Sequence, residues 1–214
     1  SGKIKADERL SASQVAHVPG RIEKLFVTFT GEYVKKGQKL ATIYSPQLIT
    51  AQQELLEALK LKEISPALAE ASRNKLKYWK IDNSIIEDLE NEGKLKETFT
   101  IYADESGVVT KRKVAVGDYI MQGEPLYELI NLSNVWVLFD AYEDDLSKVS
   151  IGNEIEFTTP SIQGKVFKSR VSFIDPIINP VTRVASLRTE VRNPNGALKP
   201  EMFVSGTIKN IKAD

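Results

Sequence analysis

The chain has no cysteine, a single histidine and only two methionines among its 214 residues. Without a thiol it can form neither a disulfide nor a thiolate metal site, and it has no cysteine nucleophile. One histidine, His17, does not allow a convincing nucleophile–histidine–acid triad. Soft cations such as Cu(I) prefer thioether or thiolate ligands, yet Met121 and Met202 lie far apart in the sequence. We therefore expect no catalytic residue, no cofactor and no metal site in this chain.

The sequence also lacks an excess of either charge, because 29 Lys and Arg residues balance 29 Asp and Glu residues. A nucleic-acid-binding protein usually has a basic excess, so this class is excluded. No apolar run approaches the roughly 20 residues that span a bilayer, and neither a signal peptide nor a lipidated cysteine is recognisable. We expect a globular protein that reaches a membrane only through segments outside this chain.

What the sequence does contain is an internal duplication. Residues 31–43 read GEYVKKGQKLATI, and residues 117–129 read GDYIMQGEPLYEL. The matching glycines, six residues apart in each copy, are predicted structural turns: Gly31 and Gly37, Gly117 and Gly123. One copy alone would expose its apolar side, so the two are expected to face each other as a small β-sandwich.

A helical segment, residues 46–92, separates the two copies. Pro46 suits a first helical turn, and leucines spaced three or four apart follow it. A second helix is predicted at about 66–79, and a third follows a cap at Asp82 or Asn83. The segment is expected to form either a short antiparallel hairpin or a three-helix bundle.

From Asn134 the pattern becomes β-rich, with strands expected at about 154–159, 164–174, 181–192 and 202–209. These strands and one short helix predict a small closed barrel. The acidic run Glu143, Asp144 and Asp145 could be paired carboxylates for acid–base catalysis. Its neighbours favour the solvated first turn of a short helix instead.

Three strings carry a family resemblance: VWVLFDAYEDDLSKVSIGNEIEFTTP, FKSRVSFIDPIINPVTR and LRTEVRNPNGALKPEMF. They resemble the β-barrel domain of periplasmic adaptors (membrane fusion proteins) of RND-type efflux pumps, closest to the CusB-like heavy-metal efflux branch. The duplicated motif resembles a biotinyl or lipoyl domain. The resemblance runs from about residue 20 to residue 209. Glu201 departs from it, because the family usually has glycine before the methionine, and this puts a tight turn in doubt.

The resemblance implies a mainly β fold with a helical insertion. Its expected domains are a split lipoyl-like β-sandwich (20–45 and 97–132), an α-helical hairpin insertion (46–96) and a β-barrel domain (133–212). Residues 1–19 lie before the resemblance, and their apolar residues suggest one extended stretch that pairs with the barrel or with a missing neighbour. The family's membrane-proximal domain is expected to be largely absent.

The implied function is that of a periplasmic adaptor in a Gram-negative bacterium, associated with the inner membrane. It would bridge an inner-membrane RND transporter to an outer-membrane channel, self-associate as a hexamer and support heavy-metal cation export. One alternative is a lipoyl or biotinyl carrier domain of a transfer enzyme. It is disfavoured because no DKA or MKM tripeptide offers a lysine for modification. Another is an adaptor of an ABC-type or secretion pump, whose helical hairpin is often longer.

Four residues are candidates for contacts with other proteins. Lys62, Glu63 and Ser65 lie at the expected tip of the helical insertion, where they are free to meet a partner. Arg183 lies at a family position on the barrel, and its planar guanidinium suits an inter-domain or subunit contact. The alternative for Arg183 is a local salt bridge that holds the turn at Asp175.

Overall fold

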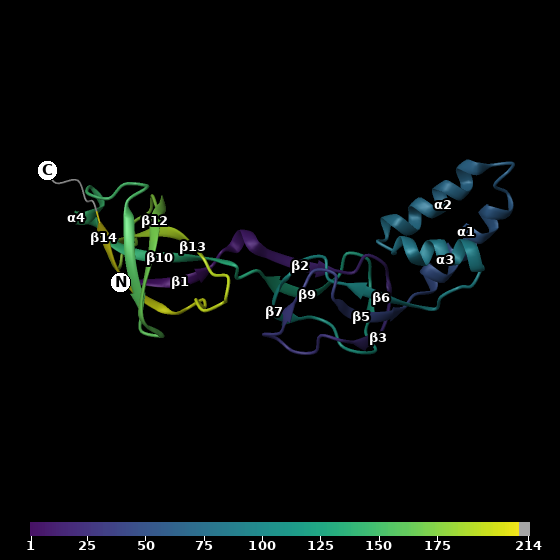
Figure 1. Ribbon diagram of the computed structural model, residues 1–214, viewed down its shortest axis with the longest axis horizontal. Coiled ribbons are helices and arrows are strands. Elements are labelled where there is room, and N and C mark those ends of the chain that lie inside the picture. The colour runs from purple at the N-terminus through teal and green to yellow at the C-terminus, as the bar shows by residue number, and fades with distance from the viewer. Residues whose placement is uncertain (210–214) are drawn as a thin grey trace. The chain divides into compact units, whose positions relative to one another are not determined.

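The structure is a computed structural model that describes residues 1–209 (Figure 1). It forms two compact units. The first joins Ser1–Ser11 to the chain from Ile130 onward, and the second is Ala12–Leu129. Strands make up most of the first unit, whereas the second combines two sheets with helices α1, α2 and α3. The predicted mainly β fold with a helical insertion is confirmed.

The described strands of the first unit close into a barrel in the order β1-β10-β13-β12-β11-β14. Their bounds are β1 (Gly2–Ala6), β10 (Asn134–Tyr142), β11 (Glu154–Thr159), β12 (Ile162–Ile174), β13 (Val184–Arg192) and β14 (Phe203–Lys209). The short helices η1 (Glu8–Leu10) and α4 (Glu143–Leu146) accompany them. Strand β1 completes the barrel by pairing antiparallel with both β10 and β14. Closure leaves no free strand edge for uncontrolled pairing.

Alternate residues of β10 fill the barrel interior, as strand geometry requires. Val135, Val137 and Phe139 are buried there. The Phe139 ring meets the Phe157 ring edge-on at a centroid distance of 5.7 Å, and Phe167 stacks on Phe157 at 5.2 Å. These rings give the barrel a packed apolar core.

The second unit contains two four-stranded sheets, ordered β2-β9-β7-β4 and β6-β5-β3-β8. The strands of the first sheet are β2 (Ser11–Val15), β4 (Tyr33–Val34), β7 (Gly107–Arg112) and β9 (Pro125–Ile130). Those of the second are β3 (Gly20–Leu25), β5 (Lys39–Tyr44), β6 (Thr98–Tyr102) and β8 (Tyr119–Ile120). Each sheet takes strands from both sides of the helical segment, so the duplicated sequences fold against each other as one body.

Three helices connect β5 to β6: α1 (Pro46–Lys60), α2 (Pro66–Tyr78) and α3 (Asn83–Glu92) (Figure 1). The Ser45 hydroxyl caps α1 by accepting a hydrogen bond from the Leu48 N–H at 3.2 Å. Asp82 caps α3 by accepting from the Ser84 N–H at 2.8 Å, and Gly93 ends α3 in the left-handed conformation, with φ of 65°. Of the two alternatives for this segment, the structure has the three-helix arrangement.

Side chains of α1 join the helices to the sandwich. Leu48 and Leu55 belong to the same buried apolar cluster as the sheet residues. Gln52 is buried, and its amide donates to the Lys96 carbonyl at 2.8 Å and accepts from the Lys96 N–H at 2.9 Å. The helices are therefore fixed to the sandwich at the place where the chain returns.

A polar cluster around Asp104 makes a second attachment. One carboxylate oxygen is 2.7 Å from His17 Nε2 and accepts from Gln14 Nε2 at 3.0 Å. The other accepts from Lys80 Nζ, in the α2–α3 connection, at 2.8 Å. Burial alone would raise the pKa of Asp104, but the hydrogen bonds from Lys80 and His17 outweigh it, and the net pKa lies below the usual value. The cluster thus favours a charged carboxylate that holds the α2–α3 connection against the sandwich.

Residues 1–19 depart from the expectation that they pair with the barrel as one stretch. Strand β1 does enter the barrel, but β2 joins the sandwich sheet beside β9, and residues from Ala12 onward belong to the second unit. The prediction is wrong for this later part, because the 3-10 turn η1 separates two strands with different partners. Residues 210–212 of the expected barrel domain lie outside the described residues.

We expect Asp104→Asn to destabilise the second unit by about 1–2 kcal/mol, because Lys80 loses its anionic partner. Because the folded-state pKa is lowered, the carboxylate's contribution is present above the unfolded value near 3.8 and is lost as the pH falls through the folded-state value. Urea unfolding at several pH values should show a wild-type advantage that disappears in acid. Glu105→Gln, an exposed neighbour, is the matched control and should change little. Equal stability of Asp104→Asn and wild type at neutral pH would contradict this account.

Tyr127 provides a separate test of the sandwich core. Its side chain is fully buried, and its hydroxyl donates to the Val27 carbonyl at 2.7 Å. Burial raises its pKa to about 12. The stability that the neutral phenol contributes is therefore complete below the unfolded value near 10 and is lost as the pH rises towards 12.

We expect Tyr127→Phe to cost about 1–2 kcal/mol at neutral pH, because the Val27 carbonyl is left without its donor. Ultraviolet titration of the folded protein should show one late-ionising phenol that is absent from the variant. Tyr78→Phe, at an exposed position, is the control and should leave the late-ionising phenol of Tyr127 in place. If Tyr127 ionises together with the exposed tyrosines, the assigned burial is incorrect.

Candidate functional site

The α1–α2 connection is an exposed tip that presents both charged and apolar side chains. Lys62 and Glu63 are exposed there, and no hydrogen bond or ion pair joins their side chains to any residue in 1–209. Ser65 precedes α2, but its side chain makes no capping hydrogen bond. The predicted interface residues Lys62, Glu63 and Ser65 are therefore brought together at one place and are available for contacts.

Sequence reasoning missed the apolar part of this tip. Leu61, Ile64 and Leu68 are all exposed, and Ile64 is 83% exposed. The signal was present, since Leu61 and Ile64 flank the charged pair outside the buried helical stripe. Exposed aliphatic side chains beside unpaired charges are typical of a protein-binding surface.

The four predicted turn glycines all have positive φ, between 80° and 93°. A Cβ atom added at any of them would meet no other atom within 4 Å, so their requirement is conformational and not steric. Equivalent glycines in the two copies make equivalent backbone hydrogen bonds. The first glycine of each copy donates its N–H to a backbone carbonyl, Gly31 to Val109 and Gly117 to Ile22, at 2.7 and 2.8 Å. The second glycine does the same, Gly37 to Ala103 and Gly123 to Ala16, both at 2.8 Å. Each turn is bonded to a segment outside its own copy.

Arg183 lies in the β12–β13 loop with φ of 55°. Its Nη2 atom is 2.7 Å from a carboxylate oxygen of Glu143 in α4, and both side chains are at least half exposed. The Asp175 carboxylate instead accepts from the Ile177 N–H at 3.0 Å. Arg183 therefore does make a local salt bridge, but with α4 and not at the Asp175 turn, whereas the inter-domain or subunit contact stays a prediction.

Glu201 keeps the turn that its sequence put in doubt. It adopts φ of 72°, in the region that glycine favours, and its N–H donates to the Ile4 carbonyl at 2.8 Å. Hydrogen bonds from Lys3 and Lys5 lower the pKa of the Glu201 carboxyl to about 2. Paired lysines therefore stabilise a glutamate that remains charged.

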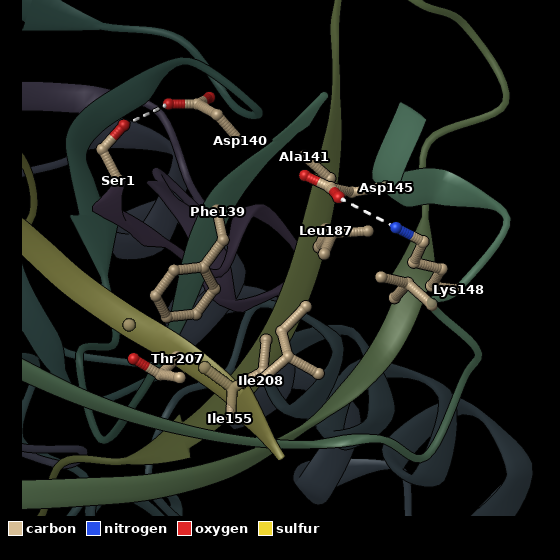
Figure 2. Close-up of a pocket in the computed structure, with 12 residues that line it drawn as sticks. Ser1, Phe139, Asp140, Ala141, Asp145, Lys148, Ile155, Leu187, Thr207 and Ile208 are labelled. Carbon is tan, nitrogen blue, oxygen red and sulfur yellow. Dashed lines mark hydrogen bonds and ion pairs between the residues drawn. The ribbon is translucent and has the colours of Figure 1, made fainter. Parts of the chain in front are cut away.

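A pocket of about 290 Å³ lies at the barrel, and Figure 2 shows its lining. Phe139, Ile155 and Leu187 contribute apolar surface, and Asp145 and Lys148 face each other at 4.0 Å. Gly206 leaves space here, because a Cβ atom at this residue would lie 2.5 Å from the Phe139 ring. The lining therefore combines an apolar surface with one exposed ion pair.

Among the residues that the structure describes, neither a group of metal ligands nor a membrane-spanning helix is present. Residues 1–209 include no group of three or more histidine, aspartate or glutamate side chains arranged to hold a metal ion. Met121 belongs to the second unit and Met202 to the first, so the soft ligands are not brought together within either unit. Among these same residues, no helix combines the length and apolar character that a membrane crossing requires.

The residues considered for catalysis are engaged in other contacts. His17 bonds to Asp104, which is engaged by Gln14 and Lys80. The acidic residues Glu143, Asp144 and Asp145 form the first turn of α4 as expected. Helices α1–α3 occupy the junction where a carrier domain would present its lysine.

Two family models match the chain one after the other. The model described as CusB, barrel-sandwich hybrid domain, matches residues 13–130. The model described as CusB-like, beta-barrel domain, matches residues 134–211. Together they cover both compact units in order.

Curated relatives agree with these matches. The cobalt-zinc-cadmium resistance protein CzcB of Cupriavidus metallidurans is 25% identical over 95% of this chain and 43% of its own length. The cation efflux system protein CusB of Escherichia coli K12 is 27% identical over 87% of this chain and 46% of its own length. The chain thus spans less than half the length of these relatives.

Solved structures share the fold. The crystal structure of ZneB from Cupriavidus metallidurans has a TM-score of 0.57 and 21% identity, covering 97% of this chain and 95% of that one. The periplasmic adaptor protein EmrA has a TM-score of 0.56 and 17% identity, covering 97% and 96%. Because the barrel-sandwich model alone matches more than half of the chain, the family is established and its members are not enzymes. The chain belongs to the CusB-like family of periplasmic adaptors, or membrane fusion proteins, of RND-type efflux pumps.

Proposed function

We propose that this chain is the adaptor part that links an inner-membrane RND transporter to an outer-membrane channel for heavy-metal cation export. The observation that carries the proposal is the succession of two CusB-type domain models over residues 13–130 and 134–211. The names of the relatives point the same way, since CusB is a cation efflux system protein and CzcB a cobalt-zinc-cadmium resistance protein. The proposed location is the periplasm of a Gram-negative bacterium, at the inner membrane.

The tip of the helical insertion is the proposed contact with the channel. Ile64 and Leu61 expose aliphatic surface beside Lys62 and Glu63, which have no partner in residues 1–209. Burying Ile64 and Leu61 against a partner removes apolar area from water. The charges of Lys62 and Glu63 would determine how the partner is aligned on the tip.

The sandwich is the proposed surface for self-association as a hexamer. Its exposed large apolar side chains include Phe29, Tyr33, Val116, Tyr119 and Met121. Several of them lie in or beside the glycine turns, whose positions are fixed by hydrogen bonds. A rigid apolar surface binds a copy of itself with little loss of conformational entropy.

The barrel is the proposed contact with the transporter, and Arg183 is part of that contact. Its pair with Glu143 is exposed, and such pairs contribute only about 0–1 kcal/mol, so Arg183 can exchange partners on binding. The planar guanidinium would then meet a carboxylate of the transporter or of a neighbouring copy.

Deletion of the gene should make the host sensitive to at least one of zinc, cobalt, cadmium, copper or silver, and the full-length protein should restore growth. We expect Ile64→Asp to fail to restore growth, because a charge at the tip cannot be buried against the channel. The measurement is the inhibitory metal concentration of each complemented strain, with equal protein amounts verified by immunoblot.

Tyr78→Asp is the matched control, since Tyr78 is 78% exposed at the opposite end of α2 from the tip. It should restore growth like the wild type. Unchanged tolerance of the deletion strain to all five metals would refute the metal-efflux function. Full restoration of growth by Ile64→Asp would refute the proposed role of the tip but not the metal-efflux function. Sensitivity to organic compounds only would favour an adaptor for another kind of pump.

A further inference from the structure

The outer face of the barrel holds an arginine between two aromatic rings. The Arg188 guanidinium of β13 lies 4.3 Å from the ring centroid of Trp136 in β10 and 4.6 Å from that of Phe173 in β12. Three separate strands therefore fix one side chain, which we call the Arg188 clamp. Aromatic rings attract the flat faces of a guanidinium, but they offer no hydrogen-bond acceptor to the N–H groups along its edge.

Two donors of this clamp make no hydrogen bond within residues 1–209, although the Asp7 carboxylate lies close enough to interact electrostatically with Arg188. Arg188 Nε and Trp136 Nε1 are both buried, and neither makes a hydrogen bond. No residue in the described part of the chain forms an ion pair with Arg188. Trp136 is only 9% exposed, so its indole N–H cannot exchange freely with solvent. Arg188 as a whole is only half-buried, so an incoming acceptor would bind the exposed part of its guanidinium, whose geometry the two rings already fix.

The clamp lines a groove of about 330 Å³, which also contains three other charged groups. Lys5 is already bonded to Glu201. Glu8 and Asp175 each add a negative charge. One carboxylate can bind Arg188 as a bidentate partner, and the flanking acids repel this single charge less than they repel a dianion such as phosphate.

Apolar surface next to the groove indicates a protein as the source of that carboxylate. A second hollow of about 550 Å³ shares Asp175 and Ser186 with the first, and Tyr142 and Ile177 line it. These two side chains are 63% and 74% exposed. A free small anion would leave this apolar surface in water, but a peptide segment would cover it.

The adjoining loop presents its apolar residues in a defined conformation. The Asn179 side-chain oxygen accepts from the N–H groups of Val181 and Thr182 at 2.9 and 3.1 Å. Val181, which is 88% exposed, is thereby held at the loop surface. An arginine and aromatic rings beside fixed aliphatic side chains form the composition typical of binding hot spots.

We propose that the Arg188 clamp binds an aspartate or glutamate side chain of a partner protein, presented among apolar residues. This deepens the proposed function and rests on it for the identity of the partner, the RND transporter. The clamp supplies a preorganised bidentate donor, and the Tyr142, Ile177 and Val181 surface supplies apolar contact.

The first experiment uses NMR spectroscopy of this chain with the peptide acetyl-Leu-Glu-Leu-amide as the probe. We expect saturable shifts of the Arg188 Nε–H and Trp136 Nε1–H signals. The glutamine version of the peptide, and phosphate, should cause none. Absence of shifts with the glutamate peptide, or equal shifts with the glutamine peptide, would overturn the site. Equal shifts with acetate would overturn the protein-partner assignment in favour of a free carboxylate.

The second experiment measures binding of the full-length protein to the transporter encoded with it. Arg188→Lys keeps the charge but loses the planar fork, and we expect affinity to fall about tenfold. Phe173→Leu opens one side of the clamp and should act in the same direction even if Arg188→Lys folds poorly. Arg170→Lys, an exposed position on β12, is the matched control and should bind like wild type.

The outcomes separate this inference from the proposed function. Wild-type binding that Arg188→Lys and Phe173→Leu leave unchanged would overturn the clamp while keeping the adaptor function. Lack of any wild-type binding, together with positive peptide shifts, would refute the transporter as partner and leave the carboxylate site supported.

Discussion

The exchange of backbone hydrogen bonds between the two duplicated segments is the constraint on which the second unit depends. Gly31 and Gly117 bond to Val109 and Ile22, and these two residues return bonds from their own N–H groups to Glu32 and Asp118. Strands β4 and β8 are only two residues long, so neither copy could form a stable sheet alone. The turns therefore act as connections between copies and not simply as reversals of the chain.

This constraint also explains how a long helical insertion is tolerated. The insertion leaves β5 and returns at β6, and these two strands are neighbours in one sheet, so its ends are already close. Leu48 and Leu55 extend the sandwich core into α1, while Gln52 and Asp104 add polar attachments at two separate points. The helices are thus joined to the sandwich by packed side chains and hydrogen bonds and not by flexible linkers alone.

Features set by neighbouring residues could be predicted from the sequence, and features set by strand register could not. The cap at Asp82 and the end at Gly93 depend on a few adjacent groups, as does the turn of α4. By contrast, the different partners of β1 and β2 depend on which sheet has a free edge. Sequence analysis considered a local salt bridge for Arg183 at the Asp175 turn, but the partner, Glu143 of α4, is set by the tertiary fold.

The Arg188 clamp escaped sequence analysis for the same reason. Trp136, Phe173 and Arg188 are brought together only by the register of β10, β12 and β13, and a bulge between Val171 and Phe173 shifts that register locally. No spacing within one segment indicates such a group. The exposed tip was located correctly, yet its apolar members were missed because apolar residues near a helix end are usually taken as core.

The distribution of unpaired groups distinguishes binding surfaces from the rest of a nearly neutral molecule. Many charged side chains pair within their own unit, as Lys60 does with Glu57 at 2.7 Å and Lys75 with Glu54 at 2.8 Å. Exposed pairs of this kind add little stability and leave little charge to attract a partner. Binding specificity must then come from charges that lack partners and lie beside exposed apolar surface. Within residues 1–209, the helical tip and the Arg188 clamp both meet this condition, one in each unit, which suits a protein that joins different partners through separate surfaces.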